Sequence, residues 1–291
     1  MRDESIAHSH GTAGPVQAAV RLAHRLGIGR VVPSILHGSQ RVTVRLYPRD
    51  VVARIVRLAD ADAVERLARE LAVARYLVEN AAPVARPSTD LPAGPHVQDG
   101  FVVTFWDFVE HVAADEDNSE HVTKAAEALR RVHQALAGFC GELPDFWLKI
   151  DRCRTALENP SAMPAIGADD RAFLHAALNR LRASMTGLPV NVAPIHGDAH
   201  LGNVFITPEG ARWNDFEDVC LGPREWDIGW IAGTRLAGFE PVNRDLLATL
   251  GYLRSVCVSV WCWEKYEIPE KRDAAKYHLE YLRRSRLFER P

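Results

Sequence analysis

Long apolar runs are missing from this chain of 291 residues, and so is an apolar leader at its start. No stretch approaches the ~20 consecutive apolar residues that a membrane-spanning helix needs. The first ten residues are polar and lack the apolar region of a secretory signal. We therefore expect a protein that has no membrane partner and is not exported.

Cysteine is sparse, and its spacing shows no pairing. The chain has five cysteines, an odd number, and no two of them are separated by two residues. Cys257 and Cys262 lie in an aromatic-rich stretch without histidines nearby. This spacing fits neither a disulfide framework nor a zinc site. Reduced thiols are usual in the cytoplasm, where we expect the protein to reside.

Basic runs are absent as well, and the formal net charge is −3. That balance argues against nucleic acid as a partner. The remaining composition, with 47% hydrophobic and 25% charged residues, is that of a globular protein. At this length the chain can form one large domain or two lobes. We expect a monomer or a weak dimer.

The first third of the chain predicts a small sheet with one main helix. Residues 1–14 read as a polar tail and residues 16–26 as a short helix. Apolar residues at every second position from 42 to 46 predict a half-buried strand, and a second strand follows at 51–56. Apolar residues at helical spacing predict a long helix over 61–79.

The remainder of the chain is predicted to be mainly helical. After an apolar strand at 101–105, helical patterns occupy 122–136 and 169–185. A short strand at 192–195 precedes a hairpin between residues 203 and 215. Further helix is predicted from there to the end of the sequence.

This order of elements predicts an α+β fold, because strands dominate first and helices later. Two lobes would be joined near residues 106–110. The N-terminal lobe, an antiparallel sheet with one main helix, is predicted to cover residues 1–107. A larger, mainly helical lobe is predicted to cover residues 108–291.

One segment, from His196 to Asn203, carries the predicted chemistry. His196, Asp198 and Asn203 follow the spacing His-x-Asp, four residues, then Asn, and Asp215 comes after a hairpin. Protein kinases place a catalytic base and metal ligands in this pattern. Phosphoryl transfer needs a carboxylate that orients the attacking hydroxyl, and oxygen ligands for Mg²⁺. We interpret His196 and His200 as residues that hold the loop.

The run His-Gly-Asp-Ala-His-Leu-Gly-Asn, followed by Asp-Phe-Glu-Asp and by Gly-Pro-Arg-Glu-Trp-Asp, resembles the aminoglycoside phosphotransferase family. That family also includes kinases of choline, sugars and macrolides. The resemblance begins near residue 30 and is strongest over 195–228. It implies a two-lobed, protein-kinase-like fold with ATP and Mg²⁺ as cofactors.

The resemblance also assigns roles to individual residues. Asp198 would be the catalytic base, and Asn203 and Asp215 would be magnesium ligands. Asp227 would hold the catalytic loop without reacting. The implied activity is transfer of the γ-phosphoryl group of ATP to a hydroxyl of a small molecule. An aminoglycoside-like antibiotic, an amino alcohol or a sugar would be the acceptor.

The resemblance is looser in the N-terminal lobe. Kinases hold the α- and β-phosphates with a strand lysine, which a glutamate of the next helix positions. Arg54 stands where that lysine belongs, and Glu70 is the candidate partner. The planar fork of an arginine can hold a phosphate, although its reach differs from that of lysine. The alternative is that Arg54 is an ordinary exposed strand residue.

Three further nucleotide contacts are implied. The sequence has no Gly-x-Gly-x-x-Gly, and only a short turn containing Ser39 is placed to close over the phosphates. The stretch 104–109 resembles the hinge whose backbone binds adenine, which makes Phe105 and Asp107 candidates. On the acceptor side, acidic residues within 115–120 could attract a polyamine-like substrate, and aromatic residues within 261–266 could line its pocket. A solvated cluster and a helix core, respectively, explain these residues better.

Two other classes of protein remain open. A pseudokinase, which binds nucleotide without turnover, is suggested by Arg54 and by the glycine-poor turn. A metallohydrolase would use His196, Asp198 and His200 as ligands, since alternate residues of a strand point to one face. Gly197 and Gly202 indicate a loop at this position and argue against that second alternative.

Overall fold

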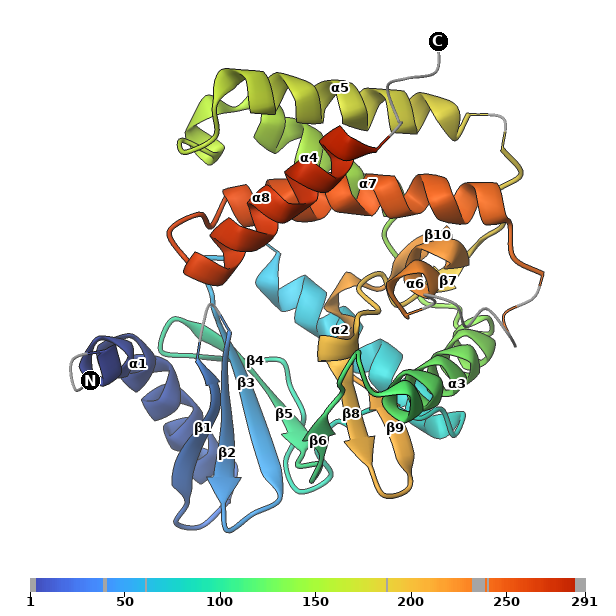
Figure 1. Ribbon diagram of the computed structural model, residues 1–291. Helices are drawn as coiled ribbons and strands as arrows, with labels where there is room; N and C mark the ends of the chain where they lie inside the picture. The colour runs from blue at the N-terminus through green and yellow to red at the C-terminus, as the bar shows by residue number, and fades with distance from the viewer. Residues whose placement is uncertain are drawn as a thin grey trace. The chain divides into compact units, whose positions relative to one another are not determined.

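The computed structural model describes residues 4–38, 41–60, 62–186, 188–231, 239 and 241–285, with side chains from Thr12 onward (Figure 1). The chain has a two-lobed, kinase-like α+β fold, as predicted. It divides into two compact units. Unit 1 comprises residues 1–141 and 200–219, and unit 2 comprises residues 142–199 and 220–291.

Unit 1 contains a five-stranded antiparallel sheet in the order β1-β2-β3-β5-β4. Its strands are β1 (Val32–Gly38), β2 (Val42–Tyr47), β3 (Val51–Arg57), β4 (His96–Gln98) and β5 (Phe101–Asp107). Burial alternates along β2, whereas β3 is buried through Val56. The strands predicted at 42–46 and 51–56 are therefore confirmed.

Helix α1 (Glu4–Arg25) lies against this sheet, as Figure 1 shows. Val16, Ala19 and Leu22 belong to the same buried cluster as Val44 and Leu46. The predicted polar tail over 1–14 is wrong, because the helix begins at Glu4 and continues through a proline at position 15. Proline removes one helical hydrogen bond, so packing of the apolar face outweighs that local penalty here.

Helix α2 (Ala63–Glu79) confirms the long helix predicted over 61–79. Leu67, Leu71 and Ala74 are buried as expected, while Val64 is exposed. The buried face also includes the carboxylate of Glu70, which is fully enclosed. A charged side chain on the inner face of an amphipathic helix requires a specific partner.

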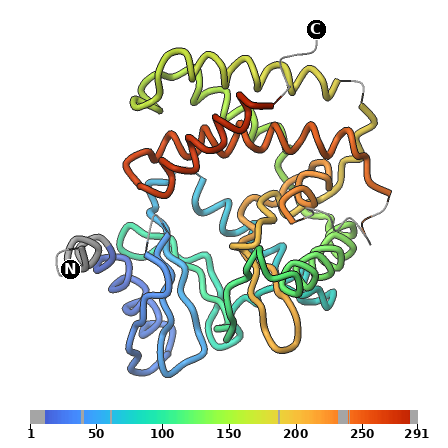
Figure 2. Tube along the Cα trace, in the orientation of Figure 1, coloured from blue at the N-terminus to red at the C-terminus, as the bar shows by residue number. Residues whose placement is uncertain are grey.

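The rest of unit 1 combines α3 (Ser119–Leu136) with a three-stranded sheet in the order β6-β8-β9. The strands are β6 (Val112–Ala113), β8 (Val204–Thr207) and β9 (Gly210–Trp213). The Asn118 side chain caps α3 by accepting hydrogen bonds from the amides of Glu120 and His121. Residues 200–219 return beside α3 (Figure 2), where the Trp213 indole donates to the carbonyl of Ala125 at 3.1 Å.

In its described residues, unit 2 is helical apart from one strand pair. Its helices are α4 (Phe146–Glu158), α5 (Ala168–Ser184), α6 (Arg224–Ile231), α7 (Arg244–Trp263) and α8 (Pro269–Arg284). Strand β7 (Val192–Ile195) pairs with β10 (Cys220–Pro223). The helix predicted over 169–185 and the strand over 192–195 are confirmed, whereas α4 and β10 were not predicted.

Helix α7 lies at the centre of the core of unit 2 and contributes Leu250, Leu253, Val256 and Val260 to it. Within the described part of the chain, α7 is long and apolar enough to cross a membrane by length and composition alone. No segment of this kind was predicted from the sequence. Most of its apolar stretch is buried, and each fully buried leucine or valine contributes about 1.5–3 kcal/mol to folding.

The two units cross the predicted lobe boundary. Packing places α3 and the β8–β9 hairpin with the sheet of unit 1. The lobe boundary at residue 107 stays a prediction, because compact packing units and functional lobes need not coincide.

Candidate active site

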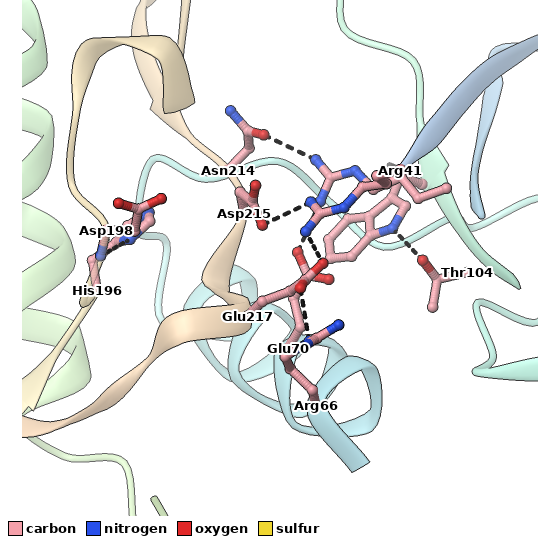
Figure 3. A network of polar contacts seen from close by, with 11 residues as sticks. Arg41, Arg66, Glu70, Thr104, His196, Asp198, Asn214, Asp215 and Glu217 are labelled. Atoms are coloured by element: carbon pink, nitrogen blue, oxygen red, sulfur yellow. Dashed lines mark hydrogen bonds and ion pairs between the residues drawn. The ribbon is translucent and has the colours of Figure 1, made fainter. Parts of the chain in front are cut away.

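The catalytic loop predicted at His196 follows β7 and is held by its main chain. Asp227, at the first turn of α6, accepts hydrogen bonds from the amides of His196 at 2.7 Å and Gly197 at 2.9 Å. The amide of Asp198 points to the His196 ring nitrogen Nδ1 at 3.3 Å (Figure 3). Asp227 and His196 are fully buried, and their contacts confirm the holding roles that we predicted for both.

The carbonyl of Gly197 is fixed from a second side. It accepts hydrogen bonds from the Trp226 indole and from the Lys149 ammonium group, each at 2.8 Å. Gly197 has a φ of +83°, which favours glycine. The main chain immediately before Asp198 is thus held by three side chains, while the Asp198 carboxylate is itself partly exposed.

Behind this loop lies a buried cation, Arg254 of α7. Its guanidinium donates to the carbonyl of Trp226 and stacks on the Trp230 ring at 4.6 Å. Burial lowers the pKa of Arg254 to about 10, although the Asp227 carboxylate acts in the opposite direction. Arg254 therefore supplies positive charge near the carboxylate that holds the loop.

In unit 1, the two predicted metal ligands lie at the open end of the β8–β9 hairpin. The amide of Asn214 donates to the carbonyl of Asn203 at 3.0 Å, which brings Asn203 next to the segment that ends in Asp215. Just before Asn203, the His200 ring nitrogen Nδ1 accepts a hydrogen bond from the amide of Gly202 at 3.0 Å. Asp215 has a φ of +67°, an uncommon conformation for a residue with a side chain.

Asp215 belongs to a network of three guanidinium groups and three carboxylates in unit 1 (Figure 3). We call it the charged network; its members are Arg41, Arg54, Arg66, Glu70, Asp215 and Glu217. Arg41 binds Asp215 at 2.8 Å and also contacts Glu217, which Arg66 binds at 2.9 Å. Burial raises the pKa of Glu217, with Asp215 adding to the effect. Burial alone would lower the pKa of Arg41, but Asp215 and Glu217 outweigh it and raise that pKa.

The Arg54–Glu70 pair predicted from the sequence is present. Arg54 binds Glu70 Oε1 at 2.8 Å and donates to the Asn214 side chain at 3.0 Å. Its guanidinium lies over the Trp106 ring, 4.5 Å from the centroid. Arg54 is only 6% exposed, so the interpretation of Arg54 as an exposed strand residue is wrong.

Glu70 is the fully buried carboxylate of the charged network, and its charge is only partly compensated. Its second oxygen, Oε2, is buried and has no hydrogen-bond partner within the described ranges. Burial raises the pKa of Glu70 to about 7, against the opposing effect of Arg54 and with reinforcement from Asp215. A carboxylate in low dielectric is disfavoured unless its charge is fully compensated.

The predicted hinge contacts stay predictions. Phe105 is fully buried, its amide donates to Ala93 and its carbonyl accepts from Ser88. The amide of Asp107 donates to the carbonyl of Arg86 at 2.9 Å, and its carboxylate accepts from the amide of Thr89. Ser39, the third predicted nucleotide contact, lies outside the described residues.

Several residues of the site were missed by sequence reasoning. Arg41 immediately precedes β2 and continues its alternation of polar and apolar residues, a local pattern that does not indicate a partner for it. Glu217 lies within the Asp-Phe-Glu motif, so its place two residues after Asp215 could have marked it as a residue of the site. Arg66 precedes Glu70 by one helical turn, a spacing at which two side chains share a face.

The oxygen atoms of Asn203 and Asp215 fit Mg²⁺, which prefers such ligands and keeps several waters or phosphate oxygens. Asp215 already holds a cationic group, the Arg41 guanidinium, at its carboxylate. Within the described residues, no three His, Cys, Asp or Glu side chains are arranged to hold a metal by themselves. Asn203 and Asp215 would supply two oxygen ligands of a Mg²⁺ ion, and phosphate oxygens would supply others.

The fold and the loop together define a kinase-like phosphotransferase, and the comparison with protein families agrees. The model of the phosphotransferase enzyme family (APH) matches residues 31–267. The chain belongs to this family, which confirms the predicted resemblance, and it is a phosphotransferase. No curated protein sequence matches the chain.

Solved structures share the fold at low sequence identity. The GDP and kanamycin complex of APH(2")-IIia has a TM-score of 0.69 and 16% identity, covering 92% of this chain and 97% of its own. Amicoumacin kinase hAmiN, in complex with AMP-PNP, Ca²⁺ and Ami, has a TM-score of 0.70 and 12% identity, with coverages of 97% and 96%. Choline kinase LicA from Streptococcus pneumoniae has a TM-score of 0.65 and 15% identity, with coverages of 91% and 98%.

Proposed function

We propose that this protein transfers the γ-phosphoryl group of ATP to a hydroxyl group of a small molecule, with Mg²⁺ as the metal. The observation that carries the proposal is the loop before Asp198, whose main chain is held by Asp227, Trp226 and Lys149. Such fixation leaves one carboxylate in a defined position, which a reaction limited by positioning requires.

Asp198 is assigned as the base. Its carboxylate would accept a hydrogen bond from the acceptor hydroxyl, orient that oxygen for attack, and take the proton as the new bond to phosphorus forms. In a largely dissociative transfer this proton leaves late, so orientation is the main contribution. The hydrogen bonds from the amides of His196 and Gly197 to Asp227 would hold the loop backbone in place while the Asp198 side chain takes up the proton.

Asn203 and Asp215 are assigned as the ligands of Mg²⁺, which would neutralise the charge of the β- and γ-phosphates when bound. Arg54, oriented by Glu70, would hold the α- and β-phosphates with its planar fork. The neighbouring structures in complex with GDP and with AMP-PNP support a nucleotide as the donor. Phe105, Asp107 and Ser39 remain assigned to the nucleotide on the family resemblance alone.

The acceptor is proposed to be a hydroxylated small molecule: an aminoglycoside-like antibiotic, an amino alcohol or a sugar. Structures that share the fold include a kanamycin complex, an amicoumacin kinase and a choline kinase. We also propose a cytoplasmic protein that acts as a monomer or weak dimer, with a nucleotide lobe over residues 1–107. The five free cysteines fit that reducing compartment.

A first experiment identifies the acceptor. A thermal-shift screen of aminoglycosides, amino alcohols and sugars, run with Mg²⁺ and AMP-PNP, should reveal a compound that raises the melting temperature. Phosphate transfer to that compound is then measured with ATP and with GTP.

The Asp198→Ala variant tests the mechanism. We expect turnover to fall by several orders of magnitude, because the hydroxyl loses its orienting base, while AMP-PNP affinity changes little. Asp169→Ala, which removes an exposed carboxylate from α5, is the control and should keep full turnover. Near-normal turnover of Asp198→Ala would contradict the assignment.

A pseudokinase is the second candidate, and one contact favours it: Arg41 occupies the carboxylate of Asp215. In such a protein Arg41 would replace the metal, and nucleotide would bind without turnover. Nucleotide binding that is unaffected by Mg²⁺, with no transfer to any compound of the panel, would favour this alternative.

A further inference from the structure

An open cavity of about 540 Å³ lies in unit 1. Its walls are the end of α2 with the chain that follows it (residues 78–86), part of α3 (residues 124–131) and the turn of the β8–β9 hairpin (residues 207–212). Figure 1 shows α3 beside this hairpin. No member of the charged network lines the cavity, so it is a separate feature of the surface.

The cavity concentrates positive charge. Five of its lining residues are basic and two, Glu127 and Glu209, are acidic. The basic residues are Arg86, Lys124, Arg130, Arg131 and Arg212. The local formal charge is therefore +3 (five minus two) in a chain whose net charge is −3. Positive charge gathered in a concave surface raises the local concentration of anions.

The basic side chains differ in whether a neighbouring acidic group or carbonyl compensates their positive charge. Lys124 binds Glu120 at 2.7 Å, Arg212 lies 3.9 Å from Glu209, and Arg131 donates to the carbonyl of Ala81 at 2.9 Å. Arg86 and Arg130 make no side-chain hydrogen bond or ion pair to any residue that the structure describes. Two guanidinium groups, one from the chain after α2 and one from α3, are thus available to a ligand.

The walls of the cavity are rigidly connected. The amide of Ala85 donates to the carbonyl of Trp213 at 2.8 Å, and the amide of Trp213 donates to Pro83 at 2.9 Å. The Trp213 indole in turn binds the main chain of α3 at Ala125. These bonds tie all three walls to one another through Trp213.

Size and chemistry identify the class of ligand. A volume of about 540 Å³ is that of a small-molecule site rather than a surface for a macromolecule. Four of the five cations are arginines, whose planar forks bind phosphate in bidentate geometry. We propose that this cavity binds a small molecule carrying two or more phosphate groups, separately from the site of phosphoryl transfer.

The test uses the full chain and inorganic tripolyphosphate as the probe. Binding is measured by isothermal titration calorimetry without Mg²⁺, in buffer of fixed ionic strength. The cavity variant is Arg86→Ala with Arg130→Ala. The control is Arg49→Ala with Arg57→Ala, which removes the same charge from exposed positions of unit 1 that do not line the cavity.

We expect the cavity variant to lose at least tenfold in affinity for tripolyphosphate, and the control to lose much less. A second variant, Arg86→Gln with Arg130→Gln, keeps polar side chains, removes the charge and should show the same loss. Melting temperatures close to that of the unaltered chain establish that each variant is folded. Absence of binding to the unaltered chain, or equal affinity of the cavity variant and the control, would overturn the proposal.

This result is independent of turnover. Tripolyphosphate that binds through Arg54 alone would leave the cavity variant unaffected and so count against the cavity. Failure of the chain to phosphorylate any alcohol would, in contrast, bear only on the proposed function.

Discussion

The loop before Asp198 and the charged network around Asp215 hold their residues in different ways. The loop is fixed by hydrogen bonds from main-chain amides and to a main-chain carbonyl, with Asp227 as the central acceptor. The charged network relies on side-chain ion pairs, in which Arg41 contacts two carboxylates. Backbone contacts of buried groups define one arrangement, whereas ion pairs can exchange partners when another cation arrives.

The difference suits the roles proposed for the two regions. A base that orients a hydroxyl needs a single position throughout the reaction. In the proposed mechanism, Asp215 would meet Mg²⁺ only when nucleotide brings it. Until then the Arg41 guanidinium compensates the charge of Asp215. We therefore expect substitutions in the loop to act on stability and turnover together, and those in the charged network to depend on pH and Mg²⁺.

Asp227→Ala should have the largest effect on stability. It leaves the buried amides of His196 and Gly197 without their acceptor, and each such loss destabilises by about 1–3 kcal/mol. The expected loss is therefore about 2–6 kcal/mol, measured by urea unfolding. Asp227→Asn keeps one acceptor oxygen and should lose less. Equal stability of Asp227→Ala and the unaltered chain would remove the distinction between the two regions.

Glu70→Gln should change the pH dependence of stability. The pKa of this glutamate is about 7 in the folded chain and 4.5 for an ordinary glutamate. Between these values the folded state binds more protons than the unfolded state, so this contribution decreases as pH rises. The stability of the unaltered chain relative to Glu70→Gln should fall from pH 4.5 to pH 7, by roughly 3 kcal/mol at most. A constant difference over that range would show that burial does not govern Glu70.

Arg41→Ala should weaken folding by about 1–2 kcal/mol, because Asp215 and Glu217 lose a charged partner. The same change should strengthen Mg²⁺ binding in the presence of AMP-PNP, since the guanidinium no longer competes for Asp215. Thermal shift against Mg²⁺ concentration measures this effect. Arg49→Ala, on an exposed turn, is the matched control. Unchanged Mg²⁺ affinity would show that Arg41 does not occupy the metal position.

The smallest effect is expected at the surface. Arg21→Ala breaks the exposed pair of Arg21 with Asp99, 2.6 Å apart. Exposed pairs are screened by water and salt and contribute little. Its melting temperature should match that of the unaltered chain, which provides the baseline for the three preceding variants.

Much of the fold followed from periodic patterns in the sequence. The strands at 42–46 and 51–56 and the helices α2, α3 and α5 were visible because each buries one regular face. The pairing of Arg54 with Glu70 was also visible, because a strand residue and an inward position of the next helix recur in kinases. The missed helix α4 does carry buried Phe146, Ile150 and Cys153 at helical spacing, so its signal was present.

The remaining contacts needed the tertiary structure. Arg41 and Asp215 are 174 residues apart in the sequence, and no local pattern couples them. Helix α1 was shortened in the prediction because proline at position 15 is a local stop signal, while the sheet that overrides it lies further along the chain. Local propensity predicts elements, whereas long-range packing decides which of their polar residues meet.

The return of residues 200–219 to unit 1 has a consequence for synthesis on the ribosome. Residues 1–141 emerge first. Strand β8, which pairs with β6, and strand β9, which pairs with β8 and packs on α3, are made only after residues 142–199, 58 positions later. At about 5–20 residues per second, this interval lasts roughly 3–12 seconds. During that time Ala125 lacks its Trp213 contact and the inner face of α3 lacks its cover. The first unit of the nascent chain therefore stays incomplete until residues 142–199, the first segment of the second unit, have been translated.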